Sequence, residues 1–194
     1  ASGVEVTEPS DPEPTPDPPS DDPNPESPTL YSYLATWDYN VGGHGNWGII
    51  GRSEVDWASM DYGILFAYYV QADGNIPEPA AYENISPDRI NAFVEDAHAA
   101  NRGALISFGG AGNSEGLISA INSAPEALAI NIVEFCNSWG FDGFEIDAEP
   151  TSRLEETGLE TFMQTVRNLA PDLHVVFAVN GGLAALARSA SMID

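Results

Sequence analysis

Four acidic residues lie close together in the stretch GFDGFEIDAEP: Asp142, Glu145, Asp147 and Glu149. From Glu145 onward, acidic residues alternate with apolar ones. Because strand side chains point alternately to opposite faces, Glu145, Asp147 and Glu149 would share one face of a strand. Crowded carboxylates are costly to bury unless they share protons or find partners. The stretch therefore predicts a strand with one packed apolar face and one face that carries out acid chemistry.

Such a row of carboxylates suits general acid catalysis, in which a side chain donates a proton to the substrate. The reaction requires a carboxyl group that still holds a proton near neutral pH. Repulsion among neighbouring carboxylates favours keeping a proton within the group. Glu149 is the last acid of the row and would lie at the carboxyl end of its strand, where barrel enzymes carry their active sites. We therefore expect Glu149 to be the general acid.

A Ca²⁺ or Mg²⁺ site is the alternative interpretation of the acidic row, since hard cations bind clustered carboxylates. The spacing is not that of an EF-hand loop, and the alternation is typical of a strand. The three histidines, His44, His98 and His174, are scattered and form no ligand pair. We expect neither a metal ion nor a cofactor.

Strands and helices alternate along the rest of the chain from residue 30. Besides the acidic stretch, four apolar runs predict strands at residues 30–37, 62–70, 104–108 and 174–179. Helical periodicity predicts a helix capped by Ser86, a second with a possible capping box of Ser123 and Glu126, a third that Pro171 stops, and the start of a fourth at residues 183–190.

Five strand-helix units of this kind predict a parallel sheet with helical crossovers. The choice lies between a doubly wound open sheet and a barrel. The glycines of VGGHGNWG follow the first strand but lack the Gly-x-Gly-x-x-Gly spacing of a dinucleotide site. This argues against a dinucleotide-binding fold, and both parallel architectures stay open on these patterns alone.

Two motifs give the chain a specific resemblance. DGFEIDAE, at residues 142–149, resembles the Asp-Gly-x-Asp-x-Asp-x-Glu signature of family 18 glycoside hydrolases, the chitinase family. SFGG, at residues 107–110, is similar to the Ser-x-Gly-Gly that ends the third barrel strand in that family. The motifs lie in the family's order on consecutive predicted strands. The resemblance covers residues 30–194 and implies an α/β fold, a (β/α)8 TIM barrel of which about the first five units are present.

The resemblance implies roles for the four acids. Glu149 would protonate the leaving oxygen, and Asp147 would orient the substrate's 2-acetamido group, which attacks in place of an enzyme nucleophile. The deeper acid, usually Asp in the family, is Glu145 here, longer by one methylene. Asp142 opens the signature and is grouped with the catalytic acids.

The resemblance also implies a binding set. Tyr33 and Ser107 match positions that hydrogen-bond the deeper acid, and Gly109 and Gly110 complete the third-strand motif. The family often places Trp directly after these glycines, but this chain has Ala111. Trp37 is our candidate for a stacking platform that replaces it. Trp47 and Tyr69 are further possibilities, and packing roles remain open for all three.

The composition of the chain indicates which partners it excludes and how the domain is bounded. The chain has 30 acidic and 6 basic residues, no lysine, and a net charge of −24, which excludes nucleic acid and anionic membrane partners. Residues 1–29 hold nine prolines and eight acids and predict a disordered linker before a domain at 30–194. We expect a secreted monomer. The acidic, lysine-free composition also fits a protein that works at high salt, where ions screen its self-repulsion. Cys136, the only cysteine, is expected to be buried on a helix.

The domain is shorter than a typical barrel of about 250 residues. In the family, the sixth strand carries a Met-x-Tyr motif and the eighth a Trp, and neither is found here. We therefore expect this chain to be the N-terminal part of the barrel and to be inactive alone. The expected substrate is chitin or chitooligosaccharide. An endo-β-N-acetylglucosaminidase acting on N-glycans, or a non-catalytic glycan-binding lectin, remains open.

Overall fold

The computed structural model describes residues 28–35, 52–80, 85–179 and 189–194. Five strands form one sheet: β1 (Tyr31–Ala35), β2 (Tyr62–Tyr68), β3 (Gly103–Gly109), β4 (Gly143–Asp147) and β5 (His174–Phe177). The α-helices are α1 (Pro87–Ala99), α2 (Ser114–Ser123), α3 (Pro125–Trp139) and α4 (Glu156–Leu169). Short 3₁₀ helices lie at Arg52–Glu54, Trp57–Ser59, Thr151–Arg153 and Ala190–Met192.

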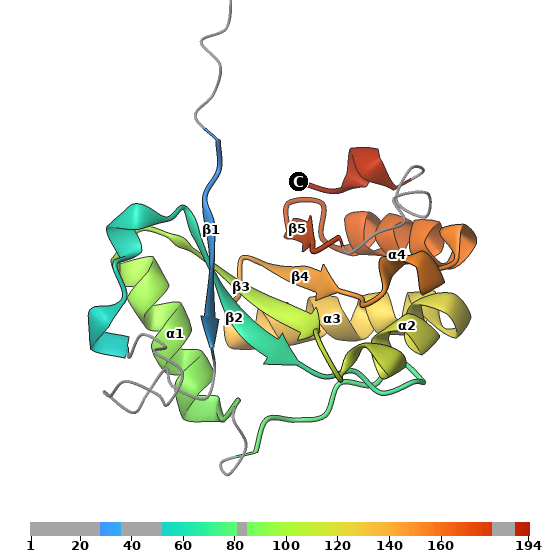
Figure 1. Cartoon of the computed structure of the whole chain (residues 1–194), viewed down its shortest axis with the longest axis horizontal. Coiled ribbons are helices and arrows are strands. Elements are labelled where there is room, and N and C mark those ends of the chain that lie inside the picture. The colour runs from blue at the N-terminus through green and yellow to red at the C-terminus, as the bar shows by residue number, and fades with distance from the viewer. Residues whose placement is uncertain (1–27, 36–51, 81–84, 180–188) are drawn as a thin grey trace, which may run out of the picture.

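The strand order decides between the two architectures. Neighbouring strands are all parallel, and their order in the sheet, β1-β2-β3-β4-β5, is their order in the chain. In a doubly wound sheet, the order of the strands across the sheet reverses at a switch point. A strand order that follows the chain without reversal is that of a barrel. Figure 1 shows the helices ranged along the sheet, with α1 near β1 and β2 and α4 near β5. The predicted α/β barrel fold is confirmed, as a partial barrel.

Most helix boundaries agree with the sequence signals. Ser86 caps α1 by accepting a hydrogen bond from the Arg89 amide, and Pro87 opens the first turn. Gly140 ends α3 in the left-handed conformation, with φ of 78°. The predicted capping box at Ser123 is wrong. Ser123 ends α2 and donates to the Ser119 carbonyl, while Ala124 precedes α3 without a side-chain cap.

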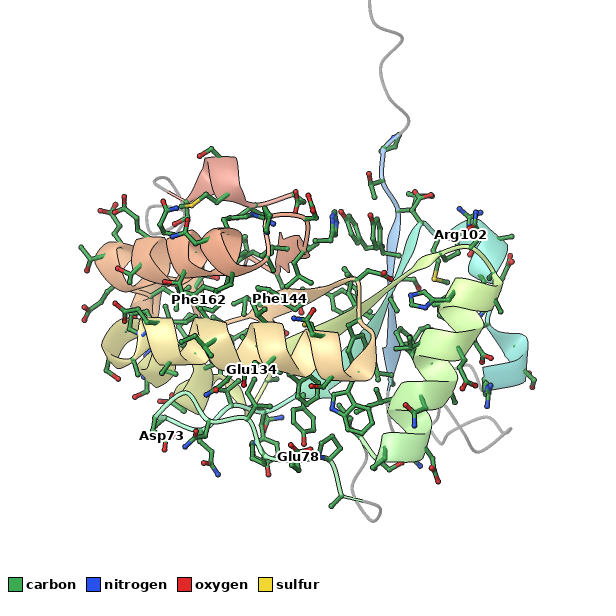
Figure 2. All side chains as sticks on the ribbon, turned by 180° about the vertical axis from the view of Figure 1, so that it is seen from behind. Asp73, Glu78, Arg102, Glu134, Phe144 and Phe162 are labelled. Atoms are coloured by element: carbon green, nitrogen blue, oxygen red, sulfur yellow. The ribbon has the colours of Figure 1, made fainter. Side chains whose placement is uncertain are left out.

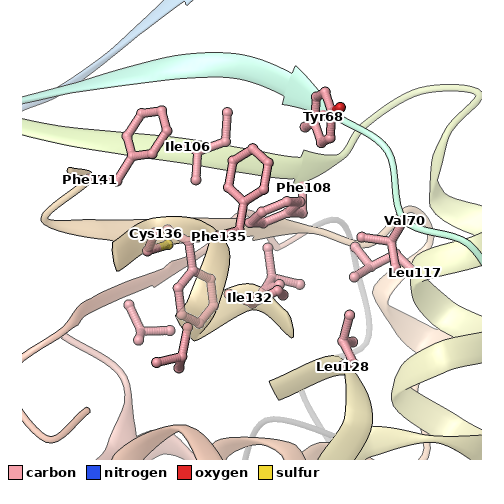
Figure 3. Close-up of a cluster of buried hydrophobic side chains, with 14 of the residues drawn as sticks. Tyr68, Val70, Ile106, Phe108, Leu117, Leu128, Ile132, Phe135, Cys136 and Phe141 are labelled. Atoms are coloured by element: carbon pink, nitrogen blue, oxygen red, sulfur yellow. The ribbon is translucent and has the colours of Figure 1, made fainter. Parts of the chain in front are cut away.

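The outer face of the sheet packs against the helices. Ile106 and Phe108 of β3 lie with Ile132 and Phe135 of α3 in one buried apolar cluster (Figure 3). Cys136 belongs to the same cluster and is fully buried, as expected, and burial raises the pKa of its thiol. This packing holds the outer face of the strands, which leaves their inner face for chemistry.

Strand β4 shows the division between the two faces most clearly. Phe144 points outward, with its ring centroid 6.1 Å from that of Phe162 on α4 (Figure 2). Ile146 belongs to the same apolar core. The acids Glu145 and Asp147 alternate with them on the opposite face, as the sequence predicted.

Some predictions concern residues outside the described ranges. These are most of the linker, the end of the first strand with Trp37, the segment with Trp47, and most of the last predicted helix. Among the described helices, none has the length and apolar character needed to cross a membrane.

Candidate active site

The acid row lies at the carboxyl end of β4. Glu145 is fully buried, Asp147 is 8% exposed at the last position of the strand, and Glu149 follows two residues later, partly exposed. On β3, Ser107 is the register partner of Glu145 and Gly109 that of Asp147. The row therefore runs from a buried acid to one that solvent reaches.

Neighbouring strands hold Glu145 by hydrogen bonds. The Tyr33 hydroxyl of β1 donates to Glu145 Oε1 over 3.2 Å, and the amide of Ala178, just after β5, donates to the same oxygen over 3.1 Å. Burial raises the pKa of the Glu145 carboxyl to about 7, and the charge of Asp147 adds to the rise. The hydroxyls of Ser107 and Tyr33 and the Ala178 amide act in the opposite direction. Glu145 can therefore hold or release a proton near neutral pH.

Ser107 lies close enough to Glu145 to lower the pKa of its carboxyl, but no hydrogen bond of good geometry joins the two side chains. Its hydroxyl and Glu145 Oε2 are both buried, and neither finds a hydrogen-bond partner among the described residues. The two residues still face each other across β3 and β4. Tyr33 thus makes the hydrogen bond expected of it, whereas Ser107 approaches the carboxyl without one.

Gly109 and Gly110 form a turn that passes close to Asp147. Both have positive φ, of 110° and 84°. A Cβ at Gly109 would lie 2.3 Å from the Asp147 carbonyl oxygen, and one at Gly110 would lie 2.7 Å from the Phe66 ring. The Gly110 amide donates to the Asp147 carbonyl over 2.8 Å. Only glycines let the chain pass this close to the acid.

Asp147 is itself an acid with a perturbed pKa. Burial raises the pKa of its carboxyl, and the charge of Glu149 raises it further. Two adjacent inward carboxyls, Glu145 and Asp147, thus both resist ionisation, and they lie beside a third that solvent reaches. The arrangement can pass a proton along the row and present it at the open end.

Comparison with known proteins identifies the family to which this chain belongs. A sequence profile of Glycosyl hydrolases family 18 matches residues 41–182. The chain belongs to glycosyl hydrolase family 18. No curated protein sequence matches it significantly.

Solved chitinase structures share the fold. A chitinase from Bacteroides thetaiotaomicron is 22% identical, with a TM-score of 0.67 over 86% of this chain and 51% of its own. The chitinase domain of the spore coat protein CotE from Clostridium difficile is 17% identical, with a TM-score of 0.64 over 88% and 49%. The Ostrinia furnacalis Group IV chitinase in complex with allosamidin is 14% identical, with a TM-score of 0.64 over 78% and 44%. The chain thus spans about half the length of these structures.

Asp142 does not reach the family 18 acid row. It precedes β4, five residues before Asp147, which is about 16 Å along an extended strand. Its carboxylate accepts from the Ala104 amide over 2.7 Å and lies 2.9 Å from His98 Nε2. The structure therefore does not bring Asp142 to the other three acids, and its contacts join the starts of β3 and β4.

A cavity of about 660 Å³ opens at this opposite end of the strands. Its walls are polar, and they are formed by Asp61, Tyr62, His98, Asn101, Arg102, Gly103, Asp142, Asp172 and His174. Family 18 barrels, like other barrels of this type, carry their chemistry at the carboxyl ends of the strands, so this cavity is not the active site. No group of three or more His, Cys, Asp or Glu side chains in the described ranges is arranged to hold a metal ion.

The sequence analysis missed Ser114, which lies against the acid row. Its buried hydroxyl contacts the backbone of both Asp147 and Glu149. The pattern Asn-Ser-Glu at residues 113–115 could have signalled a helix start. Of the proposed stacking residues, Trp37 and Trp47 lie outside the described residues, and Tyr69 is 38% exposed just after β2.

The raised pKa of Glu145 predicts a pH-dependent stability. The folded state holds this proton up to about pH 7, whereas the unfolded chain releases it near 4.5. Between these values the folded state binds more protons, so the free energy of unfolding falls as pH rises, by up to about 1.4 kcal/mol per pH unit. Glu145→Gln carries no charge and should lose this slope.

Urea denaturation at about pH 5 and about pH 8 measures the effect. The unfolding free energy of the parent protein should drop by roughly 3 kcal/mol more than that of Glu145→Gln. Equal drops in the two proteins would show that Glu145 is ionised without cost in the fold.

Proposed function

We propose that this chain belongs to a glycosidase that cleaves β-1,4-linked N-acetylglucosamine polymers, with Glu149 as the general acid. The reaction retains anomeric configuration, and the nucleophile is the substrate's own acetamido oxygen. Asp147 orients and polarises that acetamido group, and Glu145 exchanges a proton with Asp147. Tyr33 fixes the position of Glu145 in this relay.

One observation carries the proposal: Asp147 lies between a buried acid with a pKa of about 7 and a solvent-accessible acid. A double-displacement glycosidase uses an accessible carboxylate as its nucleophile. Asp147 is 8% exposed, and the Gly109–Gly110 turn crowds its backbone. It suits a hydrogen-bonding partner for a neutral amide better than a group that attacks carbon.

The substrate class is supported by this chemistry and by the related structures. An acetamido-assisted reaction requires a 2-acetamido sugar at the cleavage site, which excludes glucose polymers. The structural neighbours reported above are chitinases, and one of them is a complex with allosamidin. We therefore place chitin and chitooligosaccharides ahead of other N-acetylglucosamine glycans.

The test is the anomeric form of the first product, followed by NMR on a chitooligosaccharide, in the longest form of the protein that carries this sequence. The β-anomer should appear first and then mutarotate. Cellooligosaccharides of equal length should remain uncut. The α-anomer as first product, or cleavage of the glucose oligomer, would overturn the mechanism.

The partial barrel requires further strands before it can act on a substrate. The inner face of the sheet, with Tyr33 half exposed, has no opposing wall among the described residues. We propose that the remaining strands supply the other substrate contacts and that residues 30–194 alone are inactive. Export from the cell and action as a monomer complete the proposal. The acidic, lysine-free composition supports them.

A further inference from the structure

Ser114, at the first position of α2, joins three separate points of the backbone around the acid row. Its hydroxyl lies 3.0 Å from the Gly110 carbonyl and 3.0 Å from the Asp147 carbonyl. The Glu149 amide donates to the same oxygen, also over 3.0 Å. The side chain is 4% exposed, so water does not compete for these contacts.

A hydroxyl has one proton to donate and two lone pairs to accept with. Ser114 therefore shares its proton between two carbonyls while it accepts from the Glu149 amide. An apolar residue at this position would deprive that part-buried amide of its partner and release the backbone of Glu149 from the helix. The link fixes the backbone of Glu149 relative to Asp147, although Glu149 lies beyond the end of β4.

Two further ties bind the segment after Glu149 to the same helix. The Arg153 guanidinium pairs with both carboxylate oxygens of Glu115, the second bond measuring 2.9 Å. The Asn122 side chain donates to the Arg153 carbonyl over 3.0 Å and accepts from the Glu155 amide over 2.9 Å. Helix α2 thus holds residues 149–155 at both ends.

Helix α2 itself is packed too closely to shift. A Cβ at Gly116 would lie 1.9 Å from the Val70 carbonyl oxygen, which places the helix directly on the segment after β2. On its other side, a Cβ at Gly158 of α4 would lie 2.4 Å from the Ile121 carbonyl oxygen. Backbone-to-backbone contacts of this kind leave no flexible side chain to absorb a displacement.

We propose that Ser114 is a positioning residue for the general acid and that α2 is the platform that sets where the Glu149 carboxyl lies. The inference rests on the proposed role of Glu149. Displacement of a catalytic group by about 1 Å can cost up to 10²-fold in rate. A displaced acid loses proton transfer to the leaving group and leaves the attack of the acetamido group intact.

The test uses this difference, with kcat/KM measured in the longest form of the protein. Ser114→Ala should lower kcat/KM for a chitooligosaccharide roughly 10-fold or more, because its alcohol leaving group needs a proton. For a dinitrophenyl chitobioside, whose leaving group departs without a proton, the loss should stay below about threefold. Glu149→Gln should give the same pattern with a larger amplitude.

Ser123→Ala is the matched control, since Ser123 lies on the same helix, is exposed, and bonds only within the helix. It should leave both rates unchanged. If Ser114→Ala does not fold, Glu115→Ala removes an exposed tie instead and should show the same pattern more weakly. Equal losses on both substrates, or no loss in either variant, would overturn the proposal.

The outcomes also separate this inference from the proposed function. If Glu149→Gln shows the leaving-group pattern and Ser114→Ala does not, only the positioning role fails. If the parent protein cleaves neither substrate, the proposed function fails first. Thermal denaturation of each variant shows whether a lost rate reflects lost folding.

Discussion

Glu149→Gln should lower the turnover of a chitooligosaccharide by on the order of 10² to 10⁴, the usual contribution of general acid catalysis. The amide keeps the size of the side chain and cannot donate a proton as an acid does. Glu149 is the one acid of the row that is both beyond the strand end and partly exposed, so only it can reach a leaving oxygen. Steady-state kinetics in the longest form of the protein measures the effect.

Binding should survive this change, because Glu149 contributes a proton more than it contributes affinity. Retention of the variant on insoluble chitin, compared with the parent protein, is the control. A variant within threefold of the parent in turnover would remove Glu149 from the acid role.

Asp147→Asn should lower kcat/KM by on the order of 10²-fold or more on both a chitooligosaccharide and a dinitrophenyl chitobioside. The reason differs from that for Glu149. In the proposed mechanism Asp147 acts on the attacking group, which every substrate needs, whereas Glu149 acts on the departing group. A substrate with a good leaving group should therefore restore the kcat/KM of Glu149→Gln and should not restore that of Asp147→Asn.

Asp142→Asn is the matched control for Asp147→Asn, since it changes the same functional group at the opposite end of β4. It should weaken the contacts to Ala104 and His98 and leave turnover within about threefold. If the dinitrophenyl chitobioside restored the kcat/KM of Asp147→Asn, Asp147 would assist the departing group rather than the attacking one.

The sequence predicted the parts of this site that follow from local periodicity. The alternation from Phe144 to Asp147 is a property of one strand, so the two faces of β4 could be derived without a structure. The strand-helix order likewise predicted a parallel sheet with helical crossovers, and the resemblance of two short motifs implied the barrel. These signals depend on neighbouring residues, which a sequence displays directly.

The parts that the sequence did not predict depend on contacts between distant segments. Ser114 lies 35 residues from Glu149, and only the packing of α2 brings its hydroxyl to that amide. Asp142 shares a motif with the active acids, yet the length of β4 carries it to the other end of the sheet. Ser107 faces Glu145 as expected, but the hydrogen bonds of the carboxylate go to Tyr33 and Ala178, which no spacing in the sequence reveals.

The glycine turn around Asp147 has a consequence for how sequence variation at this site should be understood. Any side chain at Gly109 collides with the backbone of the neighbouring strand, whatever reaction the protein performs. A library of variants selected only for folding would therefore reject substitutions at Gly109 and accept many at Glu149. A library selected for turnover would reject both. Retention of Gly109 would thus record a limit on backbone geometry, and a non-catalytic descendant would lose Glu149 long before it could lose this glycine.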